Sequence, residues 1–340
     1  KNCFCFYINM NKNDDENILF KIGEIVDKIL KKSDLIYSSI IKIGQGSFGN
    51  VFKIEYAYDL SKNYSNKFVI KLFNSKKKNV EISARNELII LNKTRNKNIL
   101  KTFGPIDSDN LYKYENYNFI LLEYYQYNLK KFTNKFFFSI FDIKNIADQI
   151  INGLYHLKEK GIIHRDIKSE NILISKINKV TKVAICDFGS IELVEDKSPT
   201  VNNSKITTIE YRAPELMMRN KEFLSYDISI DYWSFGCILV ELIRKLYKNQ
   251  SNLYLFGKRS NIISIINFSI KDDQKNEEKL LNQISKLIKD DLNLYLEKFK
   301  TILNKNEKNI CSKLEQILKG LIKYDDRLNP KDILSILKEK

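Results

Sequence analysis

The stretch His164-Arg-Asp-Ile-Lys-Ser-Glu-Asn171 decides how the rest of the chain is interpreted. It places a carboxylate, an ammonium group and a carboxamide within six residues, at Asp166, Lys168 and Asn171. Apolar residues flank it on both sides, which predicts a loop held between a helix and a strand. Because its ends are anchored, such a loop can position reacting groups. Here a carboxylate can take a proton from a hydroxyl, an ammonium group can neutralise transferred charge, and a carboxamide oxygen can bind a hard cation.

Length and composition favour a globular protein with room for two lobes. The chain has 340 residues, of which 43% are hydrophobic, and this is enough for more than one core. No apolar run approaches the roughly 18 residues of a membrane span. The apolar segment from Cys3 to Ile8 is too short and too interrupted for a signal peptide. We therefore expect a soluble intracellular protein, in the cytoplasm, the nucleus or both.

Cysteine and histidine usage argues against disulfides and zinc. The five cysteines are an odd number without a repeating spacing, which does not suit a disulfide framework. The two histidines, His156 and His164, are too few for a histidine-based zinc site. We expect all five cysteines to be reduced thiols.

The net charge of +15 draws phosphates and acidic surfaces, and it raises the question of a nucleic-acid partner. The excess consists mostly of lysines scattered among Asn and Ile, and there are only eight arginines, without an Arg-rich tract. We interpret these lysines as solvated surface residues and predict no specific nucleic-acid partner.

Before the loop, the sequence predicts one helix followed by strands. Apolar residues recur at helical spacing from Ile18 to Leu30, and we favour packing of this helix on its own domain over packing on a partner. β-Branched and aromatic runs then predict strands. They span residues 40–43, 51–58, 68–73 and 119–125.

A glycine-rich turn and a lysine in an apolar strand indicate a site for an anion. Residues 44–49 read Gly-Gln-Gly-Ser-Phe-Gly, and glycines let backbone amides approach a polyphosphate. The strand that follows carries Lys71 within an apolar run, where an ammonium group needs an anionic partner. Glu87, in a helix predicted over residues 81–92, is the expected partner, although a surface position for this glutamate stays open.

After residue 125 the pattern turns mainly helical and leads into the loop. A stripe from Ile143 to Leu157 predicts a buried helix face. Two short strands are expected at residues 171–174 and 182–186, and the second ends in Asp187-Phe-Gly189. A carboxylate at a strand end, followed by a glycine, is a candidate metal ligand. Cys186, just before it, is expected to be a small packing residue.

In this order the motifs resemble those of the eukaryotic protein kinases. The resemblance rests on the glycine loop, Lys71, Glu87, the loop at 164–171, Asp187-Phe-Gly189 and Ala213-Pro-Glu215. It implies an α+β, bilobal fold with a small antiparallel sheet and one helix at 36–123 and a larger, mainly helical lobe at 124–340. Residues 1–35 would be an N-terminal extension, and the Asn- and Lys-rich residues 245–305 a divergent insert.

The resemblance also implies roles for the reacting groups. Lys71, paired with Glu87, would hold the α- and β-phosphates of ATP. Asp166 would orient and deprotonate the substrate hydroxyl, while Lys168 would steady the γ-phosphoryl group. Catalysis would then rest on positioning and charge neutralisation, without a covalent enzyme intermediate.

Asn171 and Asp187 would hold Mg²⁺. The hinge would bind adenine through the backbone of Glu123 and Tyr125, with Leu122 as gatekeeper and Leu173 beneath the base. The ATP-binding residues implied by the resemblance are Ile43, Gly44, Gln45, Gly46, Ser47, Phe48, Gly49, Val51, Val69, Lys71, Leu122, Glu123, Tyr125 and Leu173. Val69 stands where the family usually has alanine, which should narrow the pocket.

Further residues are implied to have structural or regulatory roles. Asp231 would tie the catalytic loop from below, Thr208 would bond the catalytic aspartate and lysine, and Arg327 would pair with Glu215. The segment Asp325-Asp-Arg327 is shorter than the family's usual motif, which weakens this last pairing. Arg165 would receive a phosphate placed on the segment from Asp187 to Glu215. Among the hydroxyls in this segment are those of Ser198, Thr200, Ser204, Thr207 and Tyr211.

The Asp-x-Lys-x-x-Asn form of the loop resembles Ser/Thr kinases. Tyr211-Arg-Ala-Pro-Glu215 and the sequence around Asp231 resemble the group of cyclin-dependent, mitogen-activated and glycogen-synthase kinases, although Glu210 replaces a frequent Trp and no Thr-x-Tyr motif is present. A protein substrate is expected. Whether an activating kinase or a regulatory subunit is also a partner stays open at this point. The alternatives are a pseudokinase that binds nucleotide without turnover, a nucleic-acid-binding protein and a small-molecule kinase.

Overall fold

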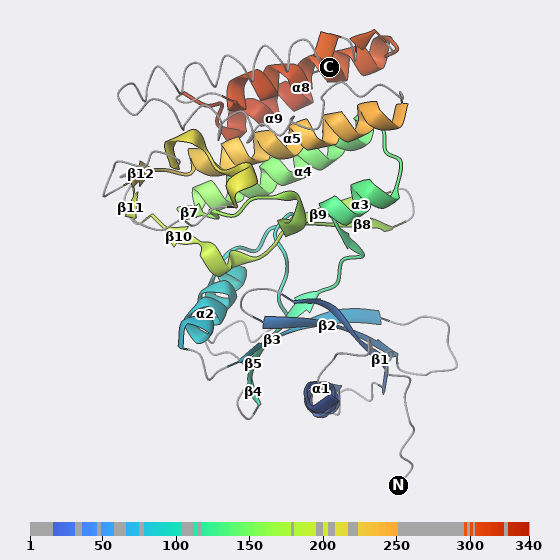
Figure 1. Ribbon diagram of the computed structural model, residues 1–340, viewed down its shortest axis with the longest axis vertical. Helices are drawn as coiled ribbons and strands as arrows, with labels where there is room; N and C mark the ends of the chain where they lie inside the picture. The colour runs from blue at the N-terminus through green and yellow to red at the C-terminus, as the bar shows by residue number, and fades with distance from the viewer. Residues whose placement is uncertain are drawn as a thin grey trace. The chain divides into compact units, whose positions relative to one another are not determined.

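Figure 1 shows the computed structural model, coloured from the N-terminus in blue to the C-terminus in red. It describes residues 16–30, 36–45, 49–57, 66–74, 78–103, 112–114, 117–177, 180–194, 200–202, 208–216, 224–250, 296–297, 300–301, 303–322 and 326–339. The chain divides into two units, each with its own core. The first comprises Lys1–Arg95 and Leu100–Tyr125, and the second comprises Asn96–Ile99 and Gln126–Lys340.

The first unit is built on a five-stranded antiparallel sheet in the order β1-β2-β3-β5-β4. All four strands expected from the sequence are present, and β4 is an additional edge strand. The bounds are β1 (Ile36–Gln45), β2 (Gly49–Ala57), β3 (Asn66–Asn74), β4 (Tyr112–Tyr114) and β5 (Tyr117–Glu123).

Strand β3 is buried on both faces, because each face is covered by a helix. Phe68, Ile70 and Leu72 point to one face, where they join the cluster that includes helix α1 (Glu16–Leu30). Residues between them point to the opposite face, since side chains alternate along a strand. There Lys71 meets helix α2 (Lys78–Lys93).

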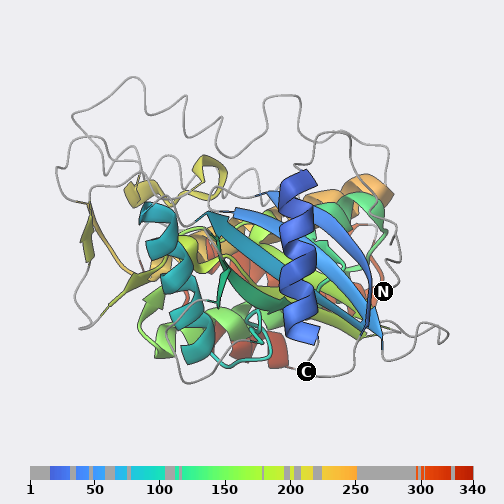
Figure 2. The same cartoon turned by 90° about the horizontal axis from the view of Figure 1, so that it is seen from below.

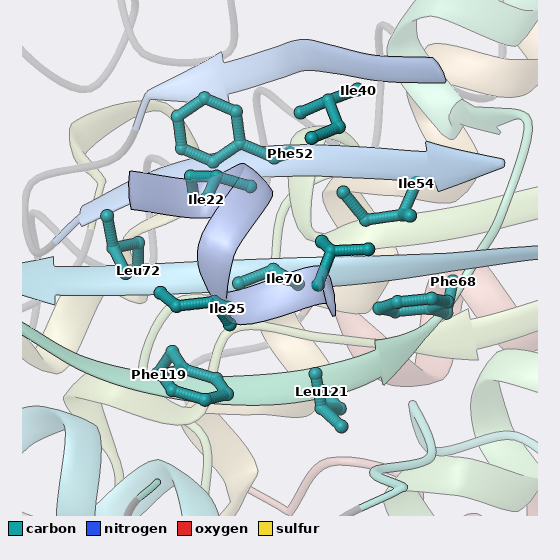
Figure 3. Packing of buried hydrophobic residues seen from close by; sticks show 11 residues of the cluster. Ile22, Ile25, Ile40, Phe52, Ile54, Phe68, Ile70, Leu72, Phe119 and Leu121 are labelled. Atoms are coloured by element: carbon teal, nitrogen blue, oxygen red, sulfur yellow. The ribbon is translucent and has the colours of Figure 1, made fainter. Parts of the chain in front are cut away.

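Helix α1 packs on its own domain, the arrangement that we favoured over packing on a partner. Ile22, Ile25 and Val26 are at most 1% exposed and lie in one cluster with sheet residues such as Phe52 and Ile54 (Figure 3). Figure 2 shows α1 lying across the blue strands of the sheet. Each buried isoleucine contributes roughly 1.5–3 kcal/mol to this packing, so the helix is a structural part of the first unit.

The second unit is mainly helical. Its described helices are α3 (Leu129–Lys135), α4 (Ile140–Glu159), α5 (Ser229–Gln250), α8 (Lys305–Leu321) and α9 (Pro330–Lys338). Helix α4 is the central one and contacts α5, α8 and α9. It begins at a capping box in which Ser139 and Asp142 satisfy each other's backbone N–H groups, and the stripe predicted from Ile143 to Leu157 is its buried face.

Short strands connect these helices to the loop at 164–171. A three-stranded sheet has the order β6-β8-β9, and two further pairs are β7 with β10 and β11 with β12. The bounds are β6 (Tyr127–Asn128), β7 (Ile162–Ile163), β8 (Ile172–Ile177), β9 (Val180–Ile185), β10 (Glu192–Leu193), β11 (Thr200–Asn202) and β12 (Leu224–Tyr226). The predicted strands at 171–174 and 182–186 correspond to β8, which begins directly after Asn171, and β9, which ends two residues before Asp187.

Residues Asn96–Ile99, which lie shortly after the end of α2, belong to the second unit. Asn98 donates from Nδ2 to Gln149 Oε1 (3.1 Å) and to Val183 O (2.9 Å), and its own carbonyl accepts from Ile185 N (2.9 Å). Gly153 of α4 makes room for this approach, because a Cβ there would lie 3.0 Å from Asn98 O and 2.8 Å from Ile185. The side chain and the backbone of Asn98 therefore both form hydrogen bonds with residues of α4 and β9.

The α+β class is confirmed, with a sheet-and-helix unit followed by a mainly helical unit. The expected insert at 245–305 begins inside α5, which continues to Gln250, and residues 251–295 lie outside the described residues. So do residues 1–15 and 31–35 of the expected extension. Within the described part of the chain, no helix combines the length and apolar character needed to cross a membrane.

Candidate active site

Asp231 holds the start of the catalytic loop from the first turn of α5. Its Oδ2 accepts from His164 N (2.7 Å) and its Oδ1 from Arg165 N (2.9 Å). The side chain is fully buried, and burial raises the pKa of Asp231, while the charge of His164 and the two backbone hydrogen bonds act in the opposite direction. The predicted contact between this aspartate and the loop is present, and it fixes two successive backbone amides.

Three side chains converge on the carboxylate of Asp166. Lys168 Nζ donates to its Oδ2 (2.7 Å), Asn171 Nδ2 donates to the same oxygen (3.0 Å), and Thr208 Oγ1 donates to Oδ1 (2.7 Å). Lys168 Nζ also lies 3.0 Å from Thr208 Oγ1. The expected contact of Thr208 with the aspartate and the lysine is therefore present. An acceptor for a proton is thus fixed beside an ammonium group, the arrangement that general-base chemistry with charge neutralisation needs.

Asn171 and Asp187 have the donor atoms that Mg²⁺ prefers. The side-chain Nδ2 of Asn171 is directed into the loop, where it also donates to Asp166 O (2.8 Å). The side-chain oxygen Oδ1 of Asn171 is therefore the atom available to a cation. Cys186 N donates to Asn171 O (3.0 Å), which places the next residue, Asp187, beside the loop. One carboxylate and one amide oxygen fit Mg²⁺, which completes its coordination with water and phosphate oxygens.

The backbone is strained at two positions of this site. Arg165 (φ 65°) and Asp187 (φ 69°) are two of the three described non-glycine residues with positive φ. Such conformations cost roughly 1–3 kcal/mol and persist where the surroundings hold them. Asp231 supplies that support at Arg165. Next to Asp187, the fully buried Phe188 packs edge-to-face on His164 with ring centroids 5.1 Å apart.

Lys71 and Glu87 form a buried ion pair in the first unit. Lys71 Nζ lies 2.6 Å from Glu87 Oε2, and the two residues are 8% and 1% exposed. The predicted pairing is present, and the alternative of a surface position for Glu87 is wrong. A paired lysine at the centre of a sheet can meet a further anion without an unpaired buried charge.

The hairpin of β1 and β2 carries the predicted phosphate-binding turn. Gly44 lies opposite Val51, and Gln45 lies opposite Asn50. Gly49 is required where it stands, because a Cβ would lie 2.2 Å from Leu72 O of the neighbouring strand. The remaining residues of the turn, Gly46, Ser47 and Phe48, lie outside the described residues.

The residues expected around adenine lie in two different units. Val69 and Leu122 are directly opposite each other in the β3–β5 pairing, and both are buried. Glu123 ends β5, Tyr125 lies two residues further along the chain, and Ile43 lies two residues before the end of β1. All three belong to the first unit. Leu173 belongs to the second unit, where it pairs with Asn128 in the β6–β8 ladder.

The pairing of Arg327 with Glu215 is present although the segment before Arg327 is short. Nη1 and Nη2 donate to the two carboxylate oxygens at 2.5 and 2.8 Å. The guanidinium group also lies over the ring of Trp233 at 5.2 Å, and the arginine side chain is 1% exposed. Bidentate arginine–carboxylate pairs are among the stronger hydrogen-bonded interactions in proteins, and this one holds the segment around Glu215 on the helical core.

Two interactions at the site were not anticipated from the sequence. Arg165 is bonded to Glu192 and Tyr226 of this chain, whereas we expected it to receive a phosphate. Glu241 of α5 accepts hydrogen bonds from Ser169 and from Tyr211 Oη (3.0 Å). Neither glutamate belongs to a local motif, so only the spatial arrangement identifies them.

A fixed aspartate beside a lysine, a nearby Asn/Asp pair, and a separate sheet with a buried Lys–Glu pair define the catalytic domain of a protein kinase. The model of the protein kinase domain matches residues 37–334, which is most of the chain. The chain belongs to the protein kinase family.

The similar proteins with curated descriptions are themselves kinases. Cyclin-dependent kinase C-2 C of Arabidopsis thaliana is 32% identical over 209 residues, which is 61% of this chain and 30% of that protein. A probable serine/threonine-protein kinase of the same plant is 30% identical over 223 residues, 65% of this chain and 29% of the relative. Probable cyclin-dependent kinase 8 of Dictyostelium discoideum is 32% identical over 218 residues, 61% of this chain and 54% of the relative. The matched part thus spans between about a third and a half of these relatives.

Proposed function

We propose that the chain transfers the γ-phosphoryl group of ATP to serine or threonine hydroxyls of protein substrates, with Mg²⁺ as cofactor. The observation that carries this proposal is the convergence of Lys168, Asn171 and Thr208 on the carboxylate of Asp166. The catalytic-loop form and the serine/threonine kinase among the relatives support the substrate class.

In the proposed reaction, Asp166 accepts a hydrogen bond from the substrate hydroxyl and takes its proton as the new O–P bond forms. The bond between the γ-phosphorus and the bridging oxygen breaks, and ADP carries away the electron pair. Lys168 Nζ, already 2.7 Å from Asp166 Oδ2, neutralises negative charge on the transferred group. Mg²⁺, when bound by Asn171 and Asp187, neutralises phosphate charge. Lys71, oriented by Glu87, holds the α- and β-phosphates.

A regulatory subunit or an activating kinase is proposed as a partner, because several relatives are named cyclin-dependent kinases. An intracellular location is proposed because Cys186, Cys237 and Cys311 are free thiols. The absence of a specific nucleic-acid partner stays a prediction from the scattered lysines.

Phosphoryl transfer from labelled ATP with Mg²⁺ tests the proposal. A generic basic protein and a Ser-Pro peptide serve as substrates, and the wild type is compared with Asp166→Asn and Asp187→Asn. We expect both variants to lose at least about a hundredfold in rate. The matched control is Asp27→Asn on the exposed side of α1, which should transfer phosphate like the wild type.

The outcomes distinguish the kinase subgroups and the pseudokinase alternative. Preference for the Ser-Pro peptide would favour the cyclin-dependent and mitogen-activated group. No transfer by the wild type, with ATP still raising its melting temperature, would favour a pseudokinase and overturn the proposal.

A further inference from the structure

The guanidinium group of Arg165 is bonded on several sides by groups of the same chain. Nε donates to Ser190 O (2.6 Å), Nη2 donates to Ile191 O (3.1 Å), and Nη1 donates to Glu192 Oε2 (2.5 Å). Nη1 also donates to Tyr226 Oη (3.1 Å). Four of the five N–H groups that an arginine offers are therefore engaged, three of them by the segment that follows Asp187.

The charged partner, Glu192, is held from two sides. Its Oε2 accepts from Tyr226 Oη (2.6 Å) as well as from Arg165, so the three side chains close a triangle. The side chains of Arg165 and Glu192 are only 12% and 19% exposed. Burial and the hydrogen bond to Glu192 raise the pKa of Tyr226, which keeps its hydroxyl a donor. In this setting a charge-assisted hydrogen bond is stronger than at an exposed position.

Backbone pairing delivers Glu192 to this place. In the antiparallel β7–β10 pair, Glu192 lies opposite Ile163, two residues before Arg165. Val194 N also donates to Gly161 O (2.8 Å), and Gly161 has φ 63°. A Cβ at Gly161 would lie 2.7 Å from Val194 O, so this glycine permits the close approach of the two segments.

We propose that Glu192 is a positioning residue that supplies Arg165 with the counter-charge an added phosphate would otherwise bring, so that transfer does not require phosphorylation of the segment between Asp187 and Glu215. A phosphate orders such a segment by pairing with an arginine. Here the arginine already has its anionic partner. A phosphate brought to the same place would meet the negative charge of Glu192, and like charges repel.

The link to catalysis runs through the backbone. Arg165 has a strained, positive φ, and the next residue is Asp166, the proposed base. The amide of Arg165 donates to Asp231 (2.9 Å), and its guanidinium group donates to Glu192. Loss of the carboxylate at position 192 leaves a largely buried guanidinium group without its counter-ion, which costs free energy. The strained backbone can then relax and move the carboxylate of Asp166.

The test rests on the proposed function and uses the full chain. Wild-type protein is treated with a phosphatase until intact-mass spectrometry shows no phosphate, and initial rates are measured before and after. A variant lacking the hydroxyls of Ser198, Thr200, Ser204 and Thr207 is assayed in parallel. We expect the phosphatase-treated wild type and this variant each to stay within about twofold of the untreated wild type, because the loss of one charge-assisted hydrogen bond would lower the rate at least about tenfold.

Glu192→Gln keeps the shape of the side chain and removes its charge. We expect kcat to fall at least about tenfold, as for the loss of one charge-assisted hydrogen bond, with the KM for ATP nearly unchanged. Glu192→Asp keeps the carboxylate and should recover part of the loss. The matched control is Glu159→Gln, at an exposed position at the end of α4, which should leave kcat unchanged. Melting temperatures show whether any loss reflects unfolding.

Two results would overturn the inference: loss of wild-type activity on removal of phosphate, or a Glu192→Gln variant with unchanged kcat. A wild type that transfers no phosphate under any condition would instead refute the proposed kinase activity, so the two failures are distinguishable.

Discussion

Asp231→Asn is the sharpest test of how the catalytic loop is held. The aspartate accepts two backbone N–H groups, from His164 and Arg165, on its two carboxylate oxygens. Asparagine offers one oxygen and one NH₂ group, so one of the two backbone N–H groups must face another donor. The variant therefore loses one of the two hydrogen bonds by its chemistry alone.

The magnitude follows from two opposing contributions. A hydrogen bond to a charged group contributes about 1.5–3 kcal/mol. If this loss falls on the ordered state of the loop, kcat/KM drops by roughly 10- to 150-fold. Overall stability should change less, because burial raises the pKa of Asp231, which means that the folded state pays for desolvating this carboxylate. Its amide replacement removes that cost.

The assay compares initial rates and urea unfolding for the wild type, Asp231→Asn and a control. The control is Asp227→Asn, an exposed aspartate that accepts Ser229 N (2.8 Å) at the start of the same helix. Asparagine keeps an oxygen that can accept from Ser229 N, and Asp and Asn are nearly equivalent at the start of a helix, so this variant should change stability by at most about 0.5 kcal/mol and keep its activity. The reasoning is refuted if Asp231→Asn stays within twofold of the wild-type rate. It is also refuted if both variants lose activity equally, because the effect would then come from the helix.

Three further predictions concern stability. Ile25→Ala, in the cluster between α1 and the sheet, should lower the urea-unfolding free energy by about 2–5 kcal/mol, while Phe20→Ala on the exposed side of α1, 68% exposed, should change it by at most about 0.5 kcal/mol. Arg327→Met should cost about 3–5 kcal/mol in the same assay, because it leaves Glu215 without its bidentate partner. Burial works to raise the pKa of Glu315, but hydrogen bonds from Lys300 and Lys319 outweigh it and lower the pKa. The stability from Glu315 is therefore present above the usual glutamate pKa and is lost as pH falls through the lowered value, so Glu315→Gln should flatten the acid limb of unfolding midpoint against pH.

Each of these has a contrary result. Equal effects of Ile25→Ala and Phe20→Ala would mean that α1 does not depend on its buried face. An Arg327→Met protein as stable as the wild type would show that the ion pair only offsets its own desolvation. An acid limb unchanged in Glu315→Gln would place the pH dependence in other carboxylates.

The sequence was informative where chemistry and spacing are local. β-Branched and aromatic runs predicted the strands of the sheet, and Lys71, isolated in an apolar strand, required an anionic partner, which is Glu87. Helical spacing predicted α1, and the sheet face it covers follows from Ile22, Ile25 and Val26 being its buried residues. These inferences depend on patterns within about 20 residues.

What the sequence did not reveal depends on register between distant segments. Glu192 meets Arg165 because the two-residue strand β10 pairs with β7 at one particular register. A strand of two residues is too short to be predicted from a periodic sequence pattern. The same holds for Glu241, which lies ten residues after Asp231 on α5 and reaches Ser169 and Tyr211. For Arg165 the loop motif alone suggested an incoming phosphate, since its carboxylate partner lies 27 residues away.

The four residues from Asn96 to Ile99 give the chain an interleaved order of assembly. They are synthesised before β5 of the first unit, yet Asn98 bonds to Val183, 85 residues later. During translation the first unit has its whole chain well before the partners of Asn98 leave the ribosome. The hydrogen bond from Asn98 to Val183 can therefore form only after β9 has been synthesised. A cut after residue 125 would therefore not yield two complete units. The helical piece would lack Asn96–Ile99 and with them the hydrogen bonds from Asn98 to Gln149 and Val183.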